Sequence, residues 1–273
     1  MPTTTATATK IAVRDLVHRY YDVQSHATTL AIQGLDLNVQ DGEFLSVLGP
    51  SGCGKSTLLY IIAGLIKPTS GQILVDGQVV SKPGPDRGMV FQEYALLPWK
   101  DVRENVGLGL KLRGLNQTQR TPIVDRFIEM VGLRGFEEKY PHELSGGMKQ
   151  RAAVARTLAS DPKVMLMDEP FAAVDAQTRI TMQEELVRIW QETRKTILFV
   201  THSVEEAAFL ADRVAVLKAR PSRVKEIVTI TTPRTNRRQA DKDPEFGAVQ
   251  ARLFDLVRAE VKESGDSATG SRH

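Results

Sequence analysis

Gly49-Pro50-Ser51-Gly52-Cys53-Gly54-Lys55-Ser56-Thr57 follows the pattern G-x-x-x-x-G-K-[ST]. A short apolar run at 44–48 precedes it and a longer one at 58–63 follows it, which predicts a buried strand before the loop and a helix after it. Glycines let backbone N–H groups turn inward and approach a phosphate closely, where a Cβ would obstruct them. The helix N-terminus adds a partial positive charge at the same point. The stretch therefore predicts a phosphate-binding loop; the alternative is a glycine-rich turn that matches by chance.

Two side chains of this loop carry chemistry of their own. Lys55 can reach the β- and γ-phosphates of a nucleoside triphosphate, and the Ser56 hydroxyl can bind Mg²⁺. We therefore expect ATP and Mg²⁺ as ligands, with all nine loop residues at the nucleotide site.

The composition is that of an ordinary globular protein. Of the 273 residues, 41% are hydrophobic and 25% are charged. The 36 basic and 33 acidic residues leave a net charge of +3, which is too small to indicate a nucleic-acid partner. A local basic excess at Arg234, Arg237 and Arg238 predicts a solvated turn.

Cysteine usage and the longest apolar run bear on the compartment. Cys53 is the single cysteine, so no disulfide can form within the chain and a reducing compartment is expected. The longest apolar run, residues 58–66, falls short of the roughly 20 residues that a bilayer span requires. Residues 1–10 lack the charged and apolar regions of a secretory signal. These features predict a cytosolic protein that reaches a membrane only through a partner.

The order of the apolar segments predicts an α/β fold. Alternation between residues 11 and 39 indicates antiparallel strands, and residues 73–78 indicate a hairpin with an Asp-Gly turn. Apolar runs at 88–91, 164–167, 196–200 and 214–217 alternate with helices, which predicts a mostly parallel, doubly wound sheet. Helical periodicity at about 102–160, with a helix from Met148 to Ala159, predicts an inserted helical segment.

The C-terminal part is expected to be an extension. Beyond Pro221 we expect less regular structure, followed by a final helix with Phe246, Val249, Leu253, Leu256 and Val257 on one face. We divide the chain into a disordered N-terminus (1–10), an ATPase domain (11–232), a C-terminal extension with a helix (233–264) and a disordered tail (265–273).

Polar residues follow three of the predicted parallel strands, at the edge where doubly wound sheets bind ligands. Asp168 stands where a second anchor for Mg²⁺ belongs, and Glu169 is the candidate for polarising the attacking water. We expect Gln92 to contact both the metal and the water, and His202 to donate to the γ-phosphate. Each of these two alone would more often be structural.

A second loop has the form of a phosphate site. Ser145-Gly146-Gly147 precedes a helix and offers a hydroxyl, exposed N–H groups and a helix N-terminus in a row. A γ-phosphate already held by Lys55 has little need of it within one chain, so the simplest account is that it closes over nucleotide bound by another subunit. Tyr20 and Tyr21 end the first strand, where a ring could stack on adenine or merely cover the sheet edge.

Together these motifs resemble the ATP-binding cassette (ABC) transporter ATPases. The matching elements occur in order over about residues 11–217: the loop at 49–57, Gln92, Leu144-Ser145-Gly146-Gly147-Met148-Lys149-Gln150, 164–169, Ala173-Val174-Asp175 and Thr201-His202. The resemblance implies a P-loop NTPase (RecA-like) core with an N-terminal antiparallel β-subdomain and an inserted helical subdomain.

The resemblance also implies a head-to-tail homodimer, in which Ser145 and Gly147 of one chain cap the γ-phosphate that Lys55 of the other chain holds. In the family the residue matching Tyr20 stacks on adenine, and the one matching Asp175 communicates between the two nucleotide sites. The chain departs from the usual pattern at Val174, where leucine is commoner, and at Ser203, where aspartate is commoner. The second departure raises the question of how the loop after His202 is braced.

Residues Gln92 to Trp99 resemble the segment that receives a coupling helix of a membrane permease, although Trp99 could instead fold back over the core. With 219–224 and 244–246, this segment resembles the nitrate, sulfonate and taurine class of bacterial importers. The resemblance implies an ATPase subunit at the cytoplasmic face of the inner membrane, served indirectly by a periplasmic or lipid-anchored solute-binding protein.

Two other functions stay open. An ABC ATPase that acts on nucleic acid or the ribosome would favour a coiled-coil insertion, a second cassette or a basic stripe, none of which is visible. A regulatory nucleotide-binding module would have little turnover.

Overall fold

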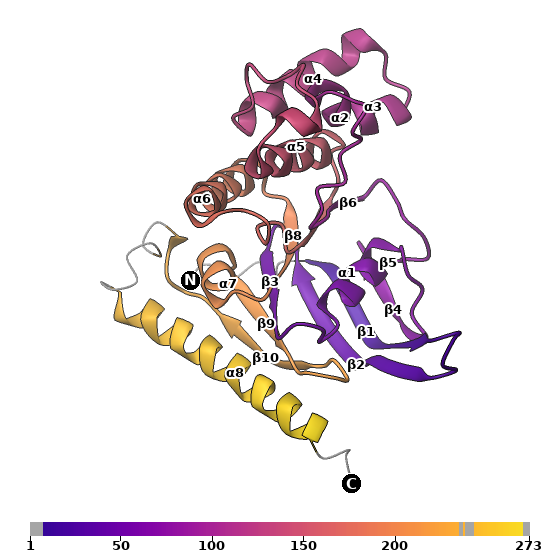
Figure 1. Ribbon diagram of the computed structural model, residues 1–273, viewed down its shortest axis with the longest axis vertical. Coiled ribbons are helices and arrows are strands. Elements are labelled where there is room, and N and C mark those ends of the chain that lie inside the picture. Colours follow the sequence, from indigo (N-terminus) through magenta and orange to yellow (C-terminus); the bar gives the residue numbers. More distant parts are fainter. Residues whose placement is uncertain (1–7, 235–236, 238–242, 270–273) are drawn as a thin grey trace. The chain divides into compact units, whose positions relative to one another are not determined.

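The computed structural model describes residues 8–234, 237 and 243–269. The chain divides into two compact units, one made of residues 1–83 and 196–273 and the other of residues 84–195. Figure 1 labels the helices and strands of both.

The first unit contains an antiparallel sheet in the order β2-β1-β4-β5. Its strands are β1 (Thr9–Tyr21), β2 (Thr28–Gln40), β4 (Ser70–Val75) and β5 (Gln78–Val79). Alternate residues of β1 and β2 are buried, which explains the alternation in the sequence. Asp76 and Gly77 make the turn between β4 and β5 with φ of 49° and 74°. Because β1 begins at Thr9, the disorder expected up to residue 10 is wrong for its last two residues; residues 1–7 lie outside the described part.

The first unit also contains parallel strands. β3 (Phe44–Leu48) lies between β8 (Thr196–Thr201) and β9 (Arg213–Leu217) and is parallel to both, and β10 (Val224–Thr229) is antiparallel to β9. Every residue of β3 and β8 is buried, as expected of strands covered on both faces. Helix α1 (Lys55–Ala63) packs against β8, and α7 (Val204–Leu210) packs against β3. This arrangement fixes the loop at 49–54 between a buried strand and a helix.

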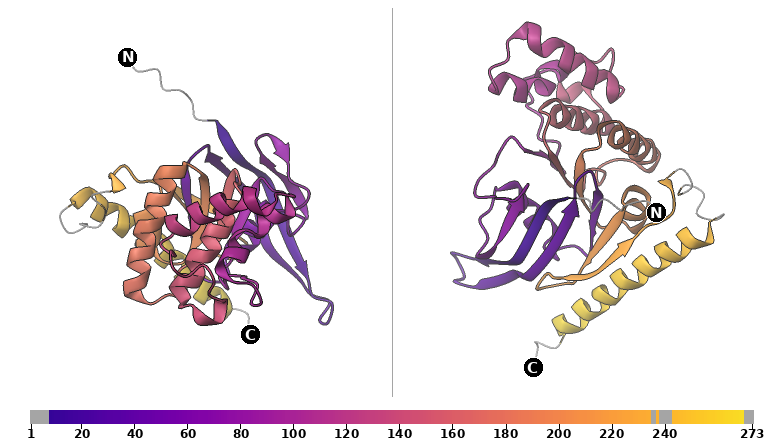
Figure 2. Two further views of the ribbon diagram at one scale, coloured as in Figure 1. Left: turned by 90° about the horizontal axis from the view of Figure 1, so that it is seen from above. Right: turned by 180° about the vertical axis from the view of Figure 1, so that it is seen from behind.

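The C-terminal part of the first unit is more regular than the sequence analysis expected. β10 is a complete strand beyond Pro221, and α8 (Pro244–Thr269) runs beside α7 and β9 (Figures 1 and 2). Since α8 continues to Thr269, a disordered tail beginning at 265 is also wrong. Residues 270–273 lie outside the described part.

The prediction of a solvated basic turn is wrong for two of its three arginines. Arg237 is only 5% exposed, and its guanidinium donates to the carbonyls of Ala208, Phe209 and Ala211 at the C-terminal end of α7. Arg234 donates to the carbonyl of Leu210 and pairs with Asp212. Cations are favourable at a helix C-terminus, where the carbonyls lack partners within the helix. Arg238 lies outside the described residues.

The second unit consists of two parallel strands and a group of helices. β6 (Arg87–Val90) pairs with β7 (Val164–Asp168), and the helices are α2 (Val102–Val106), α3 (Leu108–Leu112), α4 (Gln117–Met130), the 3₁₀ turn η1 (Pro141–Glu143), α5 (Gly146–Ala159) and α6 (Ala176–Thr193). α5 packs against α2, α3, α4 and α6, so it is the central helix of the unit. It begins at Gly146, two residues before the expected start, because Ser145 caps it.

In the described part of the chain, no helix is both long enough and apolar enough to cross a membrane.

Candidate functional site

The phosphate-binding loop leads into an uncapped helix start. Gly54 is the N-cap residue of α1 and has φ 96°, a left-handed value that favours glycine. In the described structure, no side chain caps this N-terminus. The first N–H groups of α1 therefore point toward a place that suits an anion. Lys55 is 4% exposed, and its Nζ donates to the carbonyls of Gly49 (2.9 Å) and Pro50 (3.1 Å). The ammonium group thus lies within the loop.

The turn between β9 and β10 packs behind the loop. A Cβ at Gly49 would lie 2.8 Å from Cys53 Sγ and 3.2 Å from the Leu217 carbonyl oxygen, and one at Gly54 would lie 3.2 Å from Ser222 Cβ. Cys53 itself is 2% exposed. Packing within the first unit therefore favours glycine at both positions, independently of any phosphate.

The two tyrosines at the end of β1 have different surroundings. Tyr20 Oη lies 3.0 Å from Thr57 Oγ1, so its half-exposed ring stands beside the phosphate-binding loop. His18 packs edge-on against this ring, with centroids 4.6 Å apart. Tyr21 Oη instead hydrogen-bonds to His26 Nδ1 at 2.7 Å. Of the two rings, Tyr20 is the one placed for stacking on a base bound at the loop.

His202 follows β8 in a loop that a helix cap braces. Ser203 is the N-cap of α7 and accepts from the Glu206 N–H at 3.2 Å. Thr201 Oγ1 donates to the Glu206 carboxylate and accepts from the Ser203 N–H. Serine caps a helix about as well as aspartate does, so the loop is braced despite the departure at Ser203. Since β8 is parallel to β3, His202 and the phosphate-binding loop follow neighbouring strands at the same edge.

In the second unit, the two predicted carboxylates follow β7. Asp168 is the last residue of the strand and is 3% exposed. Glu169 has φ 43°, in the left-handed region that residues other than glycine rarely occupy. β6 is parallel to β7 with Val90 opposite Met167, so Gln92 leaves the pair of strands at the same edge as Asp168. The structure thus groups Gln92 with the two carboxylates.

The candidate metal ligands fit Mg²⁺ by chemical type. Ser56, Gln92 and Asp168 supply a hydroxyl, an amide oxygen and a carboxylate, which are the hard oxygen donors that Mg²⁺ prefers. Mg²⁺ at nucleotide sites commonly takes only one or two protein carboxylates and completes its shell with phosphate and water. A single buried carboxylate at a strand end agrees with that pattern.

The serine-glycine loop and the loop at 173–175 lie side by side. Ser145 caps α5 by accepting from the Met148 N–H at 3.3 Å, and Asp175 caps α6 by accepting from the Thr178 N–H at 3.0 Å. Hydrogen bonds from Thr178 hold the pKa of Asp175 below its ordinary value. A Cβ at Gly147 would lie 2.6 Å from Thr178 Cγ2, so glycine is what lets the two helix N-termini approach.

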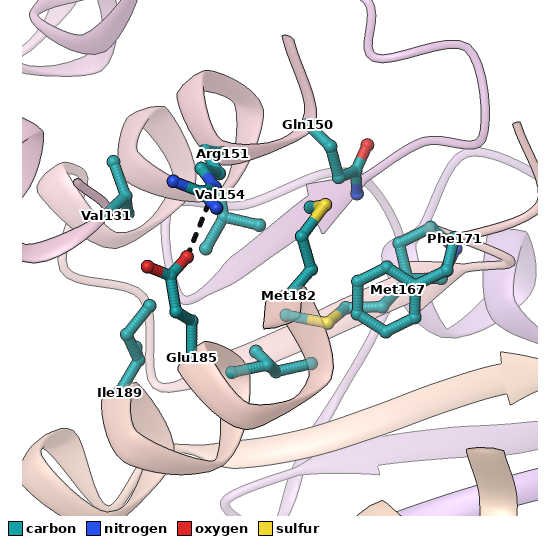
Figure 3. Close-up of a pocket in the computed structure, with 11 residues that line it drawn as sticks. Val131, Gln150, Arg151, Val154, Met167, Phe171, Met182, Glu185 and Ile189 are labelled. Atoms are coloured by element: carbon teal, nitrogen blue, oxygen red, sulfur yellow. Dashed lines mark ion pairs between the residues drawn. The ribbon is translucent and has the colours of Figure 1, made fainter. Parts of the chain in front are cut away.

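A small pocket lies between α5 and α6 (Figure 3). Its lining is mostly apolar, and Arg151 and Glu185 form an ion pair of 3.2 Å at one side. Gln150 is fully buried among the lining residues. A free volume of about 20 Å³ can hold one water molecule, so this pocket is too small for a nucleotide. The ion pair at its side links α5 to α6.

The residues described above define the class of the protein. A glycine-rich loop with an enclosed lysine, a buried aspartate at a strand end and a serine-glycine helix start are the parts of a P-loop nucleotide-binding ATPase. A family model described as ABC transporter matches residues 32–172, which is more than half of the 273-residue chain. The chain therefore belongs to the ABC transporter family.

Several relatives align along most of the chain. An uncharacterised ABC transporter ATP-binding protein of Methanocaldococcus jannaschii is 54% identical over 86% of this chain and 86% of its own length. The nitrate import ATP-binding protein NrtD of Synechocystis is 47% identical over 90% of this chain and 94% of its own. The taurine import ATP-binding protein TauB of Roseobacter denitrificans is 46% identical over 83% and 86%.

Solved structures agree with the fold. An ATP-binding cassette determined as a dimer in a post-hydrolysis state, bound to ADP and Pi, is 30% identical, covers 82% of this chain and 100% of its own, and has a TM-score of 0.72. The predicted family and the predicted fold class, an α/β core with an antiparallel β-subdomain and a helical insertion, are both confirmed.

Two residues that no predicted role covers touch the phosphate-binding loop from behind. Arg220 Nε donates to the Gly52 carbonyl at 3.2 Å, and Ser222 packs against Gly54. Both come from a turn about 170 positions further along the chain. No local motif marks such a contact, because it depends on β9 lying beside β3.

Proposed function

We propose that this chain is the ATP-hydrolysing subunit of an importer for a small oxyanion such as nitrate, taurine or an aliphatic sulfonate. The observation that carries the proposal is the 47% identity to a nitrate import ATP-binding protein over nearly the whole of both chains. The similar identity to a taurine import ATP-binding protein supports the same class of solute.

The first unit binds ATP. The phosphate-binding loop at 49–57 holds the phosphates through its backbone N–H groups and Lys55, and the ring of Tyr20 stacks on adenine. The position of Tyr20 beside Thr57 supports this assignment. Ser56, together with Gln92 and Asp168, would hold Mg²⁺, which supplies positive charge to the phosphates when it is bound.

Hydrolysis to ADP and phosphate falls to the residues at the ends of the parallel strands. Glu169 orients the attacking water and accepts its proton, Gln92 helps to position that water, and His202 donates to the γ-phosphate. The φ of 43° at Glu169 supports a functional role, since residues held in rare backbone conformations cluster at active sites.

The nucleotide site is completed by a second copy of the chain. Ser145, Gly146 and Gly147 cap the γ-phosphate bound by the other subunit, and Asp175 reports the state of one site to the other. The N-terminus of α5, which is capped by the neutral hydroxyl of Ser145, favours an anion at this surface. The dimeric form of the related cassette bound to ADP and Pi supports the same assembly.

A permease docks on the second unit. An apolar cleft of about 500 Å³ is lined in part by Phe91, Ala95, Leu108 and Leu112. Leu112 is 80% exposed and Trp99 is 69% exposed, so the alternative that Trp99 folds back over the core is wrong. An apolar cleft and exposed apolar side chains in the same unit favour a protein partner. This docking places the chain at the cytoplasmic face of the inner membrane and leaves the solute-binding protein to contact the permease.

The decisive test is Glu169→Gln. Glutamine keeps the size of the side chain but accepts no proton, so ATP should still bind while turnover falls about 10²- to 10³-fold. A dimer should then accumulate with ATP and Mg²⁺, measured by light scattering. Glu138→Gln, an exposed glutamate of the same unit, is the matched control and should change neither property. Undiminished turnover by Glu169→Gln would remove Glu169 from the mechanism.

The solute is tested in cells. Deletion of the gene should abolish growth on one oxyanion as the sole nitrogen or sulfur source, and the wild-type gene should restore it. Normal growth of the deletion strain on nitrate, taurine and alkanesulfonates would contradict the proposed class of solute.

A further inference from the structure

The turn between β9 and β10 is fixed to β2. Ser222 is fully buried, its N–H donates to the Ala31 carbonyl at 2.8 Å, and its carbonyl accepts from the Gln33 N–H at 3.1 Å. The turn is closed by a hydrogen bond of 2.8 Å from the Lys218 N–H to the Arg223 carbonyl. With these bonds in place, the turn presents Arg220 to the phosphate-binding loop, where its Nε donates to the Gly52 carbonyl.

Helix α8 brings a buried carboxylate to the same turn. Phe246, Leu253 and Glu260 are each seven residues apart and fully buried, so Glu260 occupies a position in the apolar stripe of the helix. A carboxylate buried in this way requires hydrogen-bond partners. Glu260 accepts from the Ala219 N–H at 2.9 Å and from Lys225 Nζ. Burial alone would raise the pKa of Glu260, but the hydrogen bonds from Lys225 and Ala219 and the charges of Lys225 and Lys218 outweigh it, so the pKa lies below its ordinary value.

A short series of contacts therefore joins α8 to the nucleotide site. The Glu260 carboxylate accepts a hydrogen bond from the Ala219 N–H. The next residue, Arg220, donates one to the Gly52 carbonyl. A cleft of about 820 Å³ is lined by residues 50–53 of the loop, by residues 218–220 of the turn, and by Glu260, Val261 and Glu263 of the helix. The turn therefore connects α8 to the phosphate-binding loop through hydrogen bonds at its two sides. Figures 1 and 2 show α8 running alongside β9 and β10.

We propose that Arg220 and Glu260 are positioning residues for nucleotide binding: Glu260 fixes the turn, and Arg220 thereby holds the phosphate-binding loop in the conformation that receives the phosphates. The inference rests on the proposed function only in requiring that this loop binds ATP. Glu260 acts on the turn and Arg220 on the Gly52 carbonyl of the phosphate-binding loop, so loosening them weakens the affinity for nucleotide and leaves the chemical step unchanged.

The test measures binding of a fluorescent ATP analogue with Mg²⁺, and steady-state ATP hydrolysis, on the full chain. Arg220→Gln and Glu260→Ala should each raise the Kd and KM about tenfold, the effect of one charge-assisted hydrogen bond, with kcat changed less than about twofold. The double variant should be no weaker than the weaker single variant, because both act on one contact. Glu260→Gln keeps an acceptor for the Ala219 N–H and should restore most of the affinity.

Arg252→Gln is the matched control. Arg252 of α8 pairs with Glu226 of β10 at 2.6 Å, so its loss loosens the same two elements away from the turn. Its Kd should stay at the wild-type value, and its melting temperature should change little because the pair lies at the surface. Because the Arg220 side chain is exposed, Arg220→Gln tests the proposal even where Glu260→Ala lowers stability.

The outcomes separate the two proposals. The positioning role is overturned if Arg220→Gln binds the analogue with the wild-type Kd. It is also overturned if Arg252→Gln raises the Kd as much as Glu260→Ala does. In both cases the ATPase assignment stands. The positioning role is likewise overturned if the rise in Kd of the double variant is the product of the rises in the two single variants. A wild-type chain that binds no ATP overturns the proposed function, and the positioning role with it.

Discussion

At the scale of single residues, Glu169 illustrates what a sequence can and cannot show. The pattern of an apolar strand ending in Asp168-Glu169 was enough to nominate both carboxylates. Nothing in the pattern indicated that the Glu169 backbone adopts φ 43°, a conformation that costs of order 1–3 kcal/mol outside glycine. Backbone strain is set by the elements on either side of a residue, so only the folded chain shows it.

His18 makes stability depend on pH. Burial lowers the pKa of His18 below its ordinary value. The unfolded chain takes up a proton here as the pH falls below about 6.5, whereas the folded chain does so only at lower pH. The contribution of His18 to the free energy of unfolding is therefore fully present above about pH 6.5, and it is lost as the pH falls through the pKa of the folded state.

His18→Phe keeps an aromatic edge against Tyr20 and should lose less stability on acidification. Urea unfolding at about pH 7.5 and about pH 5.5 measures this, and the gap between the two proteins can change by at most about 1.4 kcal/mol per pH unit, the slope for one proton. Equal pH dependence in both proteins would show that His18 does not titrate in this way.

Gly147 has two candidate roles that a paired substitution separates. Gly147→Ala forces a methyl against Thr178 Cγ2 and should cost about 1–3 kcal/mol of stability. Adding Thr178→Ser removes the opposing methyl and should restore the melting temperature. If the loop also caps a γ-phosphate, ATP hydrolysis by the double variant should stay about tenfold low. Full recovery of hydrolysis would mean that Gly147 serves packing alone, and Thr178→Ser by itself is the control.

At the scale of helices and strands, local patterns predicted most of the chain. Alternation found β1 and β2, the Asp-Gly turn found the β4–β5 hairpin, and apolar runs found β3, β7 and β8. β10 was missed because a strand that pairs only with β9 has no strong pattern of its own. The capping role of Arg237 was missed because its acceptors lie 26 to 29 residues earlier in the chain.

Arg237 should stabilise α7 strongly. Burial lowers the pKa of Arg237 to about 10, with nearby Arg234 acting in the same direction and Asp212 opposing it, so the guanidinium is still charged at neutral pH. Arg237→Met keeps the length of the side chain but leaves several carbonyls without a donor, which should cost about 2–4 kcal/mol in chemical denaturation. Arg258→Met, at an exposed position of α8, should change stability by less than about 0.5 kcal/mol. A loss of the same size in both would contradict the capping role.

At the scale of the whole molecule, the sequence suggested partners but no internal links. The serine-glycine loop and the exposed segment around Trp99 indicated a second subunit and a permease, because surfaces that need a partner carry distinctive residues. The link from α8 through the β9–β10 turn was invisible, since it uses an ordinary glutamate and an ordinary arginine that the tertiary fold brings together.

Docking of the permease should depend on exposed apolar side chains of the second unit: Leu112, which lines the cleft, and Trp99, which ends the segment from Gln92 to Trp99. Trp99→Ser combined with Leu112→Ser removes two side chains that are 69% and 80% exposed, so the isolated protein should lose little stability. Affinity purification from membranes should then recover at least about tenfold less of a multi-span membrane protein. Val79→Ser, which alters a residue of the first unit that is 60% exposed, is the control. Unchanged recovery would place the permease elsewhere.

The burial of Cys53 makes the sole thiol of the chain a natural reporter of the nucleotide loop. A maleimide attacks a thiolate that it can reach, and at 2% exposure this sulfur can be reached only while the loop is open. The labelling rate therefore counts loop openings, and bound nucleotide should slow it. Since no other cysteine competes, the native chain can be followed without engineered labels.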